Sequence, residues 1–230
     1  SEAASLAGHL GLGKLIVFYD SNNITIEGST DVAFTEDVGK RFAAYNWQVL
    51  QGDMYDGDGI ARLVNEAKAD AERPTLIILK STIGKGSPNK AGSAEVHGAP
   101  LGEDEIKATR RALGIPEEAS FWIAEEAKAF FEEKKKEGPK LEAAWQASFD
   151  QWAAANPALK AEWDQWMSET MDLSKVEWPT YKEGDSLATR VASGNALQAI
   201  TKAVPNLYGG SADLQPSNNT KIPGGDYQKN

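Results

Sequence analysis

The chain has 230 residues, of which 41% are hydrophobic, and this is enough for one full-sized core or two smaller ones. Its 24 basic and 34 acidic residues give a formal charge of −10. Such an acidic chain repels nucleic acid and anionic membrane surfaces, so a bound phosphate group must be held by local donors. The lack of cysteine in the sequence excludes disulfides, thiolate metal sites and a cysteine nucleophile.

No apolar run has the length of a membrane span, and the N-terminus lacks the basic and apolar regions of a signal peptide. We therefore expect a cytoplasmic protein that binds neither membrane nor nucleic acid. Residues 1–10 already read as an Ala-rich helix without an initiator methionine, and residues 222–230 are loop-like. Both ends predict a chain that is cut from a longer protein.

Short apolar runs alternate with helical patterns in the first part of the chain. Residues 15–19 and 75–79 are continuous and rich in β-branched residues, as in strands buried on both faces, and residues 47–50 are a weaker candidate. A helix that starts at Thr35 and a helix with its apolar stripe at 60–67 lie between them. This alternation predicts the α/β class with parallel βαβ units.

Longer segments follow. Residues 83–101 lack periodicity and are rich in Gly and Pro, which predicts a functional loop before a helix at 103–113. Residues 116–171 predict two or three helices, divided at Pro139 and Pro157, that pack on one another and on the sheet. Aromatic residues repeat at helical spacing there, and we interpret them as packing residues in preference to a ligand-binding box.

A second unit is predicted after a linker. Ser186 is a plausible N-cap of a helix that Pro205 ends, and residues 206–208 are a short strand candidate before a loop. The predicted division is 1–115 for an α/β part, 116–171 for a helical segment, 172–185 for an interdomain linker, and 186–230 for a truncated second α/β unit.

The first group of polar residues follows the strand at 15–19. Hard cations such as Mg²⁺ take oxygen ligands, often shared with phosphate oxygens. The Asn22 side-chain oxygen and the Ile24 carbonyl, two residues further on, are a suitable pair at a strand end. A plain polar turn is the alternative, because Asn and Asp favour turns in any case.

The second group lies in the Gly-rich loop that leads to His97. Glycines allow backbone N–H groups to approach a phosphate closely. A histidine flanked by glycine can donate to an anion or transfer a proton near neutral pH. The alternative is an ordinary surface histidine, while His9, at an apparent helix end, is interpreted as a capping residue.

The third group begins with Arg190, near the start of the predicted second-unit helix. A cation at a helix N-terminus opposes the macrodipole, unless an anion is held there by the arginine and the helix N–H groups together. Ser217, in the later loop, could complete a phosphate site. A surface arginine paired with a nearby carboxylate is the alternative.

Five segments together resemble the transketolase family, and they run in the family's order over nearly the whole chain. These segments are EAASLAGHLGLGKLIVFYDSNNITIEG, STIGKGSPNKAG, HGAPLG, TRVASGNALQAI and LYGGSADLQPSNNT. The resemblance implies an incomplete parallel sheet of the thiamine-diphosphate-binding fold with an additional helical segment. It also implies a parent enzyme that moves a two-carbon ketol unit from a ketose phosphate to an aldose phosphate.

Enzymes of this family are homodimers that bind thiamine diphosphate and Mg²⁺ or Ca²⁺ between α/β domains of two subunits. By motif match, the resemblance implies that Asn22 ligates the metal through its side chain and Ile24 through its carbonyl. It implies that His97 contacts the cofactor diphosphate and the substrate as the catalytic histidine, and that Asp213 lies beside the cofactor. Arg190 and Ser217 would hold the sugar phosphate.

The sequence also departs from the family pattern. The family's YDDNG reads YDSNN at residues 19–23, where Asn23 can still adopt a left-handed conformation, and Ala94 stands where a histidine is frequent. The upstream GDG element, the later activating Glu and the C-terminal domain are absent from these residues. We therefore expect this chain alone to be inactive.

Two alternatives are of other kinds. The first is another thiamine-diphosphate enzyme, such as dihydroxyacetone synthase or deoxyxylulose phosphate synthase, against which the HGAPLG and GGSADL pair argues. The second is a non-catalytic acidic interaction module.

Overall fold

The structure is a computed structural model that describes residues 1–168 and 170–225. The chain divides into two compact units, the first running from Ser1 to Ile123 and the second beginning at Ala124. Each unit is described by itself below.

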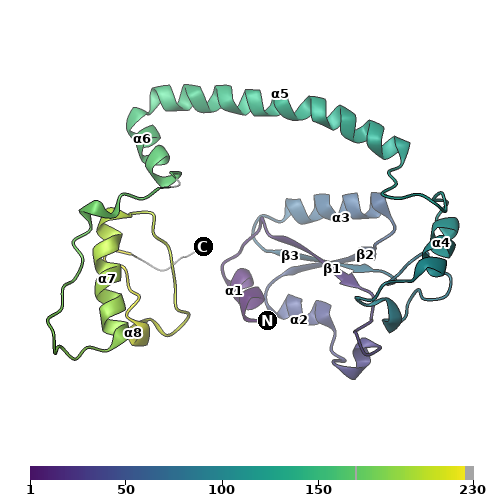
Figure 1. Cartoon of the computed structure of the whole chain (residues 1–230), viewed down its shortest axis with the longest axis horizontal. Coiled ribbons are helices and arrows are strands. Elements are labelled where there is room, and N and C mark those ends of the chain that lie inside the picture. Colours follow the sequence, from purple (N-terminus) through teal and green to yellow (C-terminus); the bar gives the residue numbers. More distant parts are fainter. Residues whose placement is uncertain (169, 226–230) are drawn as a thin grey trace. The chain divides into compact units, whose positions relative to one another are not determined.

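The first unit is built on a three-stranded parallel sheet of order β1-β3-β2 (Figure 1). The strands are β1 (Ile16–Ser21), β2 (Gln48–Asp53) and β3 (Thr75–Lys80). Ile16 of β1 and Gln48 of β2 both stand opposite Thr75, so the carboxyl ends of all three strands lie at the same end of the sheet. This end is called the carboxyl edge below. All three strands are predicted by the apolar runs of the sequence, and the α/β class is confirmed.

Helices cover both faces of this sheet (Figure 1). On one face, Ala7 of α1 (Glu2–His9) packs with Trp47 and Leu76, joined by α2 (Val38–Ala44). On the other face, Ala67 of α3 (Gly57–Ala69) packs against Ile77 and Leu79. The central strand β3 is therefore buried from both sides, which is why its sequence is apolar without alternation.

Side-chain caps set where two of the helices begin. The Asp37 carboxylate accepts a hydrogen bond from the Lys40 amide at 3.0 Å, so α2 starts at Val38 and not at Thr35 as predicted. Asp56 caps α3 in the same way through the Gly59 amide at 2.9 Å. The predicted helix at 103–113 is α4 (Glu103–Ala112), which ends before Gly114 at a φ of 69°.

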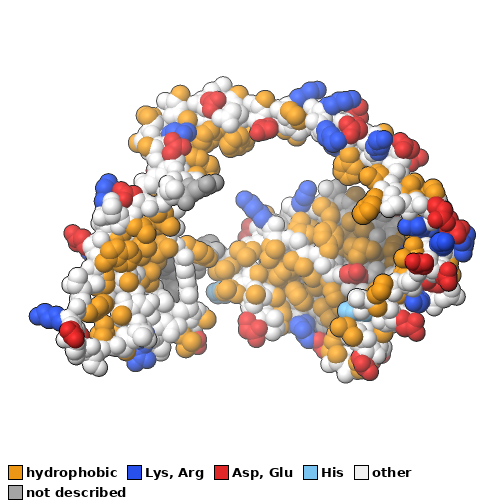
Figure 2. All heavy atoms as spheres, viewed as in Figure 1, with side chains coloured by type: hydrophobic (Ala, Val, Ile, Leu, Met, Phe, Trp, Pro, Cys, Tyr) orange, Lys and Arg blue, Asp and Glu red, His pale blue; other side chains and the backbone are white. Residues whose placement is uncertain are grey.

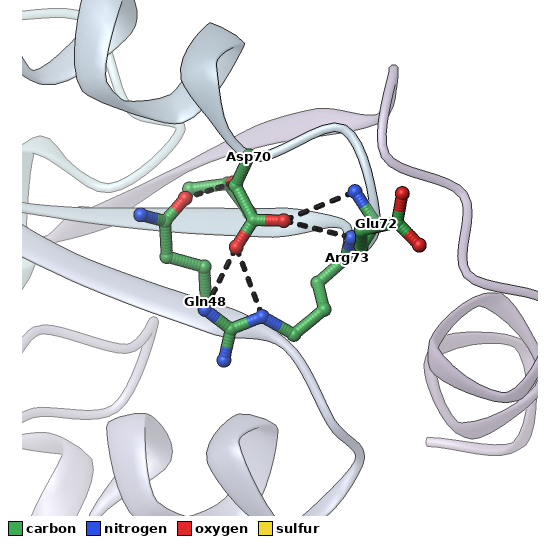
Figure 3. Close-up of polar contacts among 5 residues, drawn as sticks. Gln48, Asp70, Glu72 and Arg73 are labelled. Carbon is green, nitrogen blue, oxygen red and sulfur yellow. Dashed lines mark hydrogen bonds and ion pairs between the residues drawn. The ribbon is translucent and has the colours of Figure 1, made fainter.

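The connection between α3 and β3 is held by Asp70 (Figure 3). Its carboxylate accepts hydrogen bonds from the amides of Glu72 and Arg73, both at 3.1 Å, and from the Arg73 guanidinium at 2.7 and 2.9 Å. The bond from the Arg73 side chain is the largest cause that holds the pKa of Asp70 below its ordinary value, and the two amide bonds add to it. Nearby, Gln48 accepts from the Thr75 hydroxyl at 2.8 Å. This network closes the amino-terminal edge of the sheet.

Strand β1 is paired on one side only, with β3, among the residues that the structure describes. Hydrophobic side chains gather on the visible side of this unit, over the part where Figure 1 labels α1 and β1 (Figure 2). Phe18 of β1 is 49% exposed, and Leu6 of α1 is 54% exposed. The outer side of strand β1 therefore presents unpaired backbone groups beside apolar surface, as expected for an incomplete sheet.

The second unit is helical in the part that the structure describes. Its helices are α5 (Glu125–Ala155), α6 (Pro157–Trp166), α7 (Thr189–Ala203) and the short α8 (Gln215–Asn218). Helix α5 continues through Pro139, so the prediction of a break there is wrong. Ion pairs three residues apart, such as Glu132–Lys135 and Glu133–Lys136, support the turns just before this proline. Pro157 does mark the break, at the first position of α6.

The aromatic residues of α5 and α6 pack on one another. The ring of Phe149 lies 5.2 Å from that of Trp145, 5.4 Å from Trp152 and 5.5 Å from Trp163. Trp145 nevertheless stays 57% exposed, and no described residue of α5 is buried. The cluster joins two helices at a corner without forming an enclosed core.

Two expectations for the end of the chain are wrong. Helix α7 has Ala188 as its N-cap and begins at Thr189, so Ser186 does not cap it. Residues 206–208 form no strand, because a lone strand needs a partner and the described residues of this unit contain no other strand. In the described ranges, no helix combines the length and the apolar character that crossing a bilayer would require.

Candidate functional site

The turn after β1 is built around the Asn22 side chain. The Asn22 amide oxygen accepts a hydrogen bond from the Ile24 amide at 2.9 Å, an Asx-type turn, and Asn23 adopts a left-handed φ of 60°. Asn23 therefore takes the conformation expected of it where the family pattern has glycine. Asn22 and Ile24 are both half-buried, so the turn is partly shielded from solvent.

The backbone beyond this turn orients the Ile24 carbonyl. Ile24 stands opposite Ser29 in an antiparallel bridge, whose hydrogen bonds run from the Thr25 amide to Gly28 and from the Thr30 amide to Asn23. These flanking bonds turn the N–H and C=O groups of Ile24 away from Ser29. The N–H group meets the Asn22 oxygen, and within the described residues no donor bonds to the C=O group. Two oxygens thus lie on the same side of the turn.

The loop after β3 leaves the sheet beside this turn. The Ser81 hydroxyl donates to the Asp20 carboxylate, and the Ser81 amide donates to the Ser21 carbonyl at 3.3 Å. Both contacts join the carboxyl ends of β1 and β3. The Asn22 turn and the loop that carries His97 therefore start from the same edge of the sheet, as loops at ligand sites of α/β proteins do.

Tyr55, just after β2, fixes the start of the same loop. Its hydroxyl accepts from the Thr82 amide at 2.8 Å and donates to the Thr82 carbonyl at 3.1 Å. The Lys85 ammonium lies 2.9 Å from the centroid of the Tyr55 ring, a cation–π contact. All three strands therefore contribute to the place where the loop begins.

Glu105 of α4 holds the middle of the loop. Its carboxylate accepts from the Ser87 hydroxyl and from the Asn89 amide at 3.0 Å and the Asn89 side chain at 2.8 Å. Glu105 is only 8% exposed, and Ser87 only 3%. The bonds from Ser87 and Asn89 lower the pKa of Glu105 to about 2, so the side chain is a carboxylate at neutral pH.

His97 is exposed at the far part of this loop. It follows the short 3₁₀ helix Ala94–Val96, and its amide donates to the Ala94 carbonyl at 3.0 Å. A side chain at Gly84 would place its Cβ 3.0 Å from Val96, so the start of the loop packs directly against the residue before His97. The histidine is thus carried by a folded segment.

A polar cavity of about 320 Å³ also lies at this edge, beside α2. It is lined by Asn23 together with the acidic residues Asp31, Glu36 and Asp37. Glu36 is paired with Arg41 and Asp37 with Lys40, so this cavity offers an anionic ligand no unpaired cation among its lining residues.

The second unit carries the other predicted residues. Arg190 is exposed in the first turn of α7, and the described residues provide it with no ion pair, so the predicted alternative of a paired surface arginine is not observed. Gly194, one turn later on the same face, is buried where α7 meets α8, and its Cβ would lie 2.8 Å from Asn219. Ser217 is in α8, so Arg190 and Ser217 come from two helices in contact. Asp213 is exposed in the turn just before α8.

The predicted residues thus fall into two groups, one in each unit. Asn22, Ile24 and the His97 loop share an edge of the sheet, while Arg190, Asp213 and Ser217 lie around α7 and α8. Sequence reasoning missed the residues that hold the loop, namely Tyr55, Glu105 and also Lys90, whose ammonium donates to the Leu101 carbonyl. The only signal for Glu105 was its place in an acidic helix start, which is equally typical of a residue that complements the helix dipole.

Comparison with known proteins decides the family. The family model described as "Transketolase, thiamine diphosphate binding domain" matches residues 1–172, which include the predicted segments 1–115 and 116–171. This chain belongs to the transketolase family. The alternative assignments to another thiamine-diphosphate enzyme and to an interaction module are not favoured.

Curated transketolases support this along almost the whole chain. The transketolase of Treponema pallidum is 48% identical over 222 residues, which cover 95% of this chain and 33% of that protein. The transketolase of Geobacillus stearothermophilus is also 48% identical and covers 98% of this chain and 34% of its own length. The chain therefore spans about a third of the length of these relatives.

Solved transketolase structures have the same fold. The Pichia stipitis transketolase in complex with sedoheptulose 7-phosphate matches with a TM-score of 0.84 and 41% identity, over 97% of this chain and 33% of that one. The Leishmania mexicana transketolase matches with a TM-score of 0.84 and 38% identity, over 96% of this chain and 33% of that one. The parallel sheet of this chain is thus a transketolase sheet.

Proposed function

We propose that this chain supplies the diphosphate- and metal-binding part of a transketolase that transfers a two-carbon ketol unit from a ketose phosphate to an aldose phosphate. The observation that carries this proposal is that the carboxyl ends of β1 and β3 lie side by side. There the Asn22 turn starts beside the loop that carries His97, and its Ile24 carbonyl accepts no hydrogen bond from the part of the chain that the structure describes. An ion with a diphosphate group needs such a combination of oxygens and exposed donors.

The metal would be Mg²⁺ or Ca²⁺, held by the Asn22 side-chain oxygen and the Ile24 carbonyl. Both ions favour oxygen ligands, and a neutral pair suits a site where the diphosphate already contributes negative charge. Within residues 1–168 and 170–225, no three His, Asp or Glu side chains gather as a ligand set. Further ligands would therefore come from the diphosphate and from other parts of the enzyme.

His97 would donate to a diphosphate oxygen and contact the substrate. Its exposure on a folded loop leaves both ring nitrogens accessible for such contacts. Thiamine diphosphate, when bound, supplies the reactive carbon for the transfer. The protein residues would then bind and orient the cofactor and the substrate and exchange protons with them. A histidine and a fixed turn can perform these tasks.

The second unit would bind the sugar phosphate through Arg190 and Ser217, and Asp213 would lie beside the cofactor. Arg190 has no carboxylate partner among the described residues, so its guanidinium can pair with a phosphate. A sugar phosphate is bound in the Pichia stipitis relative. We further propose a cytoplasmic homodimer in which the two subunits complete the active sites.

Metal-dependent cofactor binding tests the metal assignment. In an active transketolase that carries this segment, Asn22→Ala should weaken Mg²⁺-dependent thiamine diphosphate binding at least about tenfold, since even residues that only support metal ligands cost 10- to 100-fold. Isothermal titration with and without Mg²⁺ measures this. The matched control is Asn23→Gly, which keeps the left-handed turn and should bind as the parent does. An unchanged affinity in Asn22→Ala would rule out the ligand role.

A further inference from the structure

The segment from Ser81 to Gly102 is ordered by a buried carboxylate. It contains only the short 3₁₀ helix before His97 as regular structure, yet its middle is bonded to Glu105 of the following helix. The carboxylate accepts three hydrogen bonds, from the Ser87 hydroxyl and from both nitrogens of Asn89. Glu105 thus anchors Ser87 and Asn89 to α4.

Lys90 extends this anchor to the far end of the loop. Its amide donates to the Ser87 hydroxyl oxygen at 3.2 Å, and its side-chain ammonium donates to the Leu101 carbonyl at 2.9 Å. The Lys90 carbonyl accepts from the Ser93 hydroxyl at 2.8 Å. The side-chain bond to Leu101 closes the segment between residues 90 and 101 into a loop whose ends are held together.

His97 lies within the segment that this bond closes. Neither Glu105 nor Lys90 is hydrogen-bonded to it in the described structure. An effect of these two residues on the histidine would therefore pass through the loop backbone. The Ala94–Val96 turn and its contact with Gly84 connect the closed segment to the end of β3.

The cost of burial indicates that this carboxylate has a specific task. A charged group that is only 8% exposed loses hydration, and only specific donors offset this loss. An apolar residue at this helix position would pack without that cost. Contacts with the loop offset the cost of burying this carboxylate, because its partners Ser87 and Asn89 both belong to the loop.

We propose that Glu105 and Lys90 are positioning residues for His97, which they hold at the carboxyl edge of the sheet by fixing residues 87–101. The proposal rests on the proposed function, in which His97 meets the diphosphate of the cofactor. The hydrogen bonds of Glu105 and Lys90 to the loop, called the clamp below, are present in the chain without any ligand. Its test can therefore be separated from the test of the function.

The ligand-free part of the test uses the 230-residue chain in solution. The sequence has two histidines, so His9→Gln identifies the His97 ring signal by nuclear magnetic resonance. In Glu105→Gln, amide hydrogen exchange at residues 87–101 should accelerate at least tenfold, while β3 stays protected. The His97 signal should move toward its position in a short peptide of the same loop sequence.

Three further variants separate positioning from general damage. Glu103→Gln removes an exposed acid from the same helix turn and should leave the loop and the His97 signal as in the parent. Glu105→Asp keeps the carboxylate and should restore part of the protection. Lys90→Met removes the bond to Leu101 and the weaker attraction of the ammonium to Glu105 but leaves the Ser87 and Asn89 bonds in place, so exchange should accelerate more at residues 93–101 than at Ser87.

The ligand part adds Mg²⁺ with inorganic diphosphate at millimolar concentrations, with Mg²⁺ sulfate as the control salt. The His97 signal of the parent should shift with diphosphate, and Glu105→Gln should require at least a tenfold higher concentration for half the shift. Equal responses in both chains, or a protected loop in Glu105→Gln, would overturn the positioning role. A parent signal that ignores diphosphate, with the exchange results as expected, would overturn the proposed site and leave the clamp as a structural element.

Discussion

The metal site proposed at the carboxyl edge of the sheet depends on single polar atoms. The Asn22 side-chain oxygen and the Ile24 carbonyl lie on the same side of one turn because the bridge to Ser29 orients the backbone. The same bridge could form with many residues at position 24, and the ligand proposed there is a backbone carbonyl that every residue has. Side-chain identity therefore matters at Asn22 and backbone geometry matters at Ile24.

At Arg190, removal of the guanidinium should change substrate preference. In an active transketolase that carries this segment, Arg190→Ala should raise KM for phosphorylated sugars by roughly 10- to 150-fold, since a charge-assisted hydrogen bond contributes about 1.5–3 kcal/mol. KM for unphosphorylated sugars should change little. Steady-state kinetics with both substrate types measures the difference, with Lys202→Ala, in the last turn of the same helix, as the control. Equal losses for both types would count against a phosphate contact.

For Glu105, the low pKa predicts a pH dependence with a definite sign. The folded-state pKa of about 2 lies below the ordinary value of 4.5, so the stabilisation is fully present above pH 4.5. It is lost as the pH falls from 4.5 through about 2, when the carboxylate takes up a proton. The difference in unfolding free energy between the parent and Glu105→Gln should therefore be constant from pH 7 to 5 and narrow below 4.5. Urea titrations at a series of pH values measure it, and a gap that widens in acid would contradict the assignment.

The elements of the first unit are held in place by close contacts of small residues. Helix α1 approaches the end of α2 so closely that a Cβ at Gly8 would lie 1.7 Å from the Tyr45 carbonyl oxygen. The Trp47 side chain donates to the Ala4 carbonyl at 2.8 Å across the same contact. Helix α1 therefore depends on glycine for its distance from the segment before β2.

Gly8→Ala should destabilise the first unit despite the better helix propensity of alanine. The propensity gain is roughly 0.8–1.0 kcal/mol, while overpacking typically costs about 1–3 kcal/mol. A backbone carbonyl at 1.7 Å has little room to yield, so the overpacking cost should prevail and α1 should move outward. Thermal unfolding followed by circular dichroism measures this. Gly28→Ala, where a Cβ meets nothing within 4 Å, is the control, and a more stable Gly8→Ala chain would show that the contact is looser than described.

At the scale of the whole molecule, the residues proposed for the metal and the cofactor diphosphate lie in one compact unit, and those proposed for the sugar phosphate lie in the other. Asn22, Ile24 and His97 belong to the first, and Arg190 and Ser217 belong to the second. The net charge of −10 makes local donors, and not a general positive field, responsible for any phosphate that is bound. The set of oxygens proposed to bind a metal is also small, with two from one turn.

Because of this small ligand set, the 230-residue chain should bind its cofactor weakly. Thiamine diphosphate with Mg²⁺ at about 1 mM should raise the free energy of unfolding by no more than about 0.4 kcal/mol, the value reached when ligand concentration equals Kd. A thermal-shift series with cofactor alone, Mg²⁺ alone and both together measures this. Strong stabilisation that needs both would contradict the view that the described residues form only part of the site.

The sequence alone determined the α/β class, the three strands, the helix that ends at Gly114 and the polar turn after β1, because each depends on local patterns. Apolar runs, cap residues and glycines act within a few positions along the chain, so their effects can be predicted from the sequence. The same holds for Asn22 and His97 as candidates, which the family motifs carry.

Only the tertiary structure decided which atoms meet. Glu105 lies 18 positions from Ser87, and it becomes a loop anchor only when α4 packs beside the loop. The bridge to Ser29 turns the Ile24 carbonyl away from Ser29, and no described residue donates to it. The start of α7 at Thr189 and the passage of α5 through Pro139 also went against local signals. At Glu105, burial and pairing with a distant segment decide the role of a residue whose local helix preference amounts to only a fraction of a kcal/mol, and a linear sequence does not reveal these contacts.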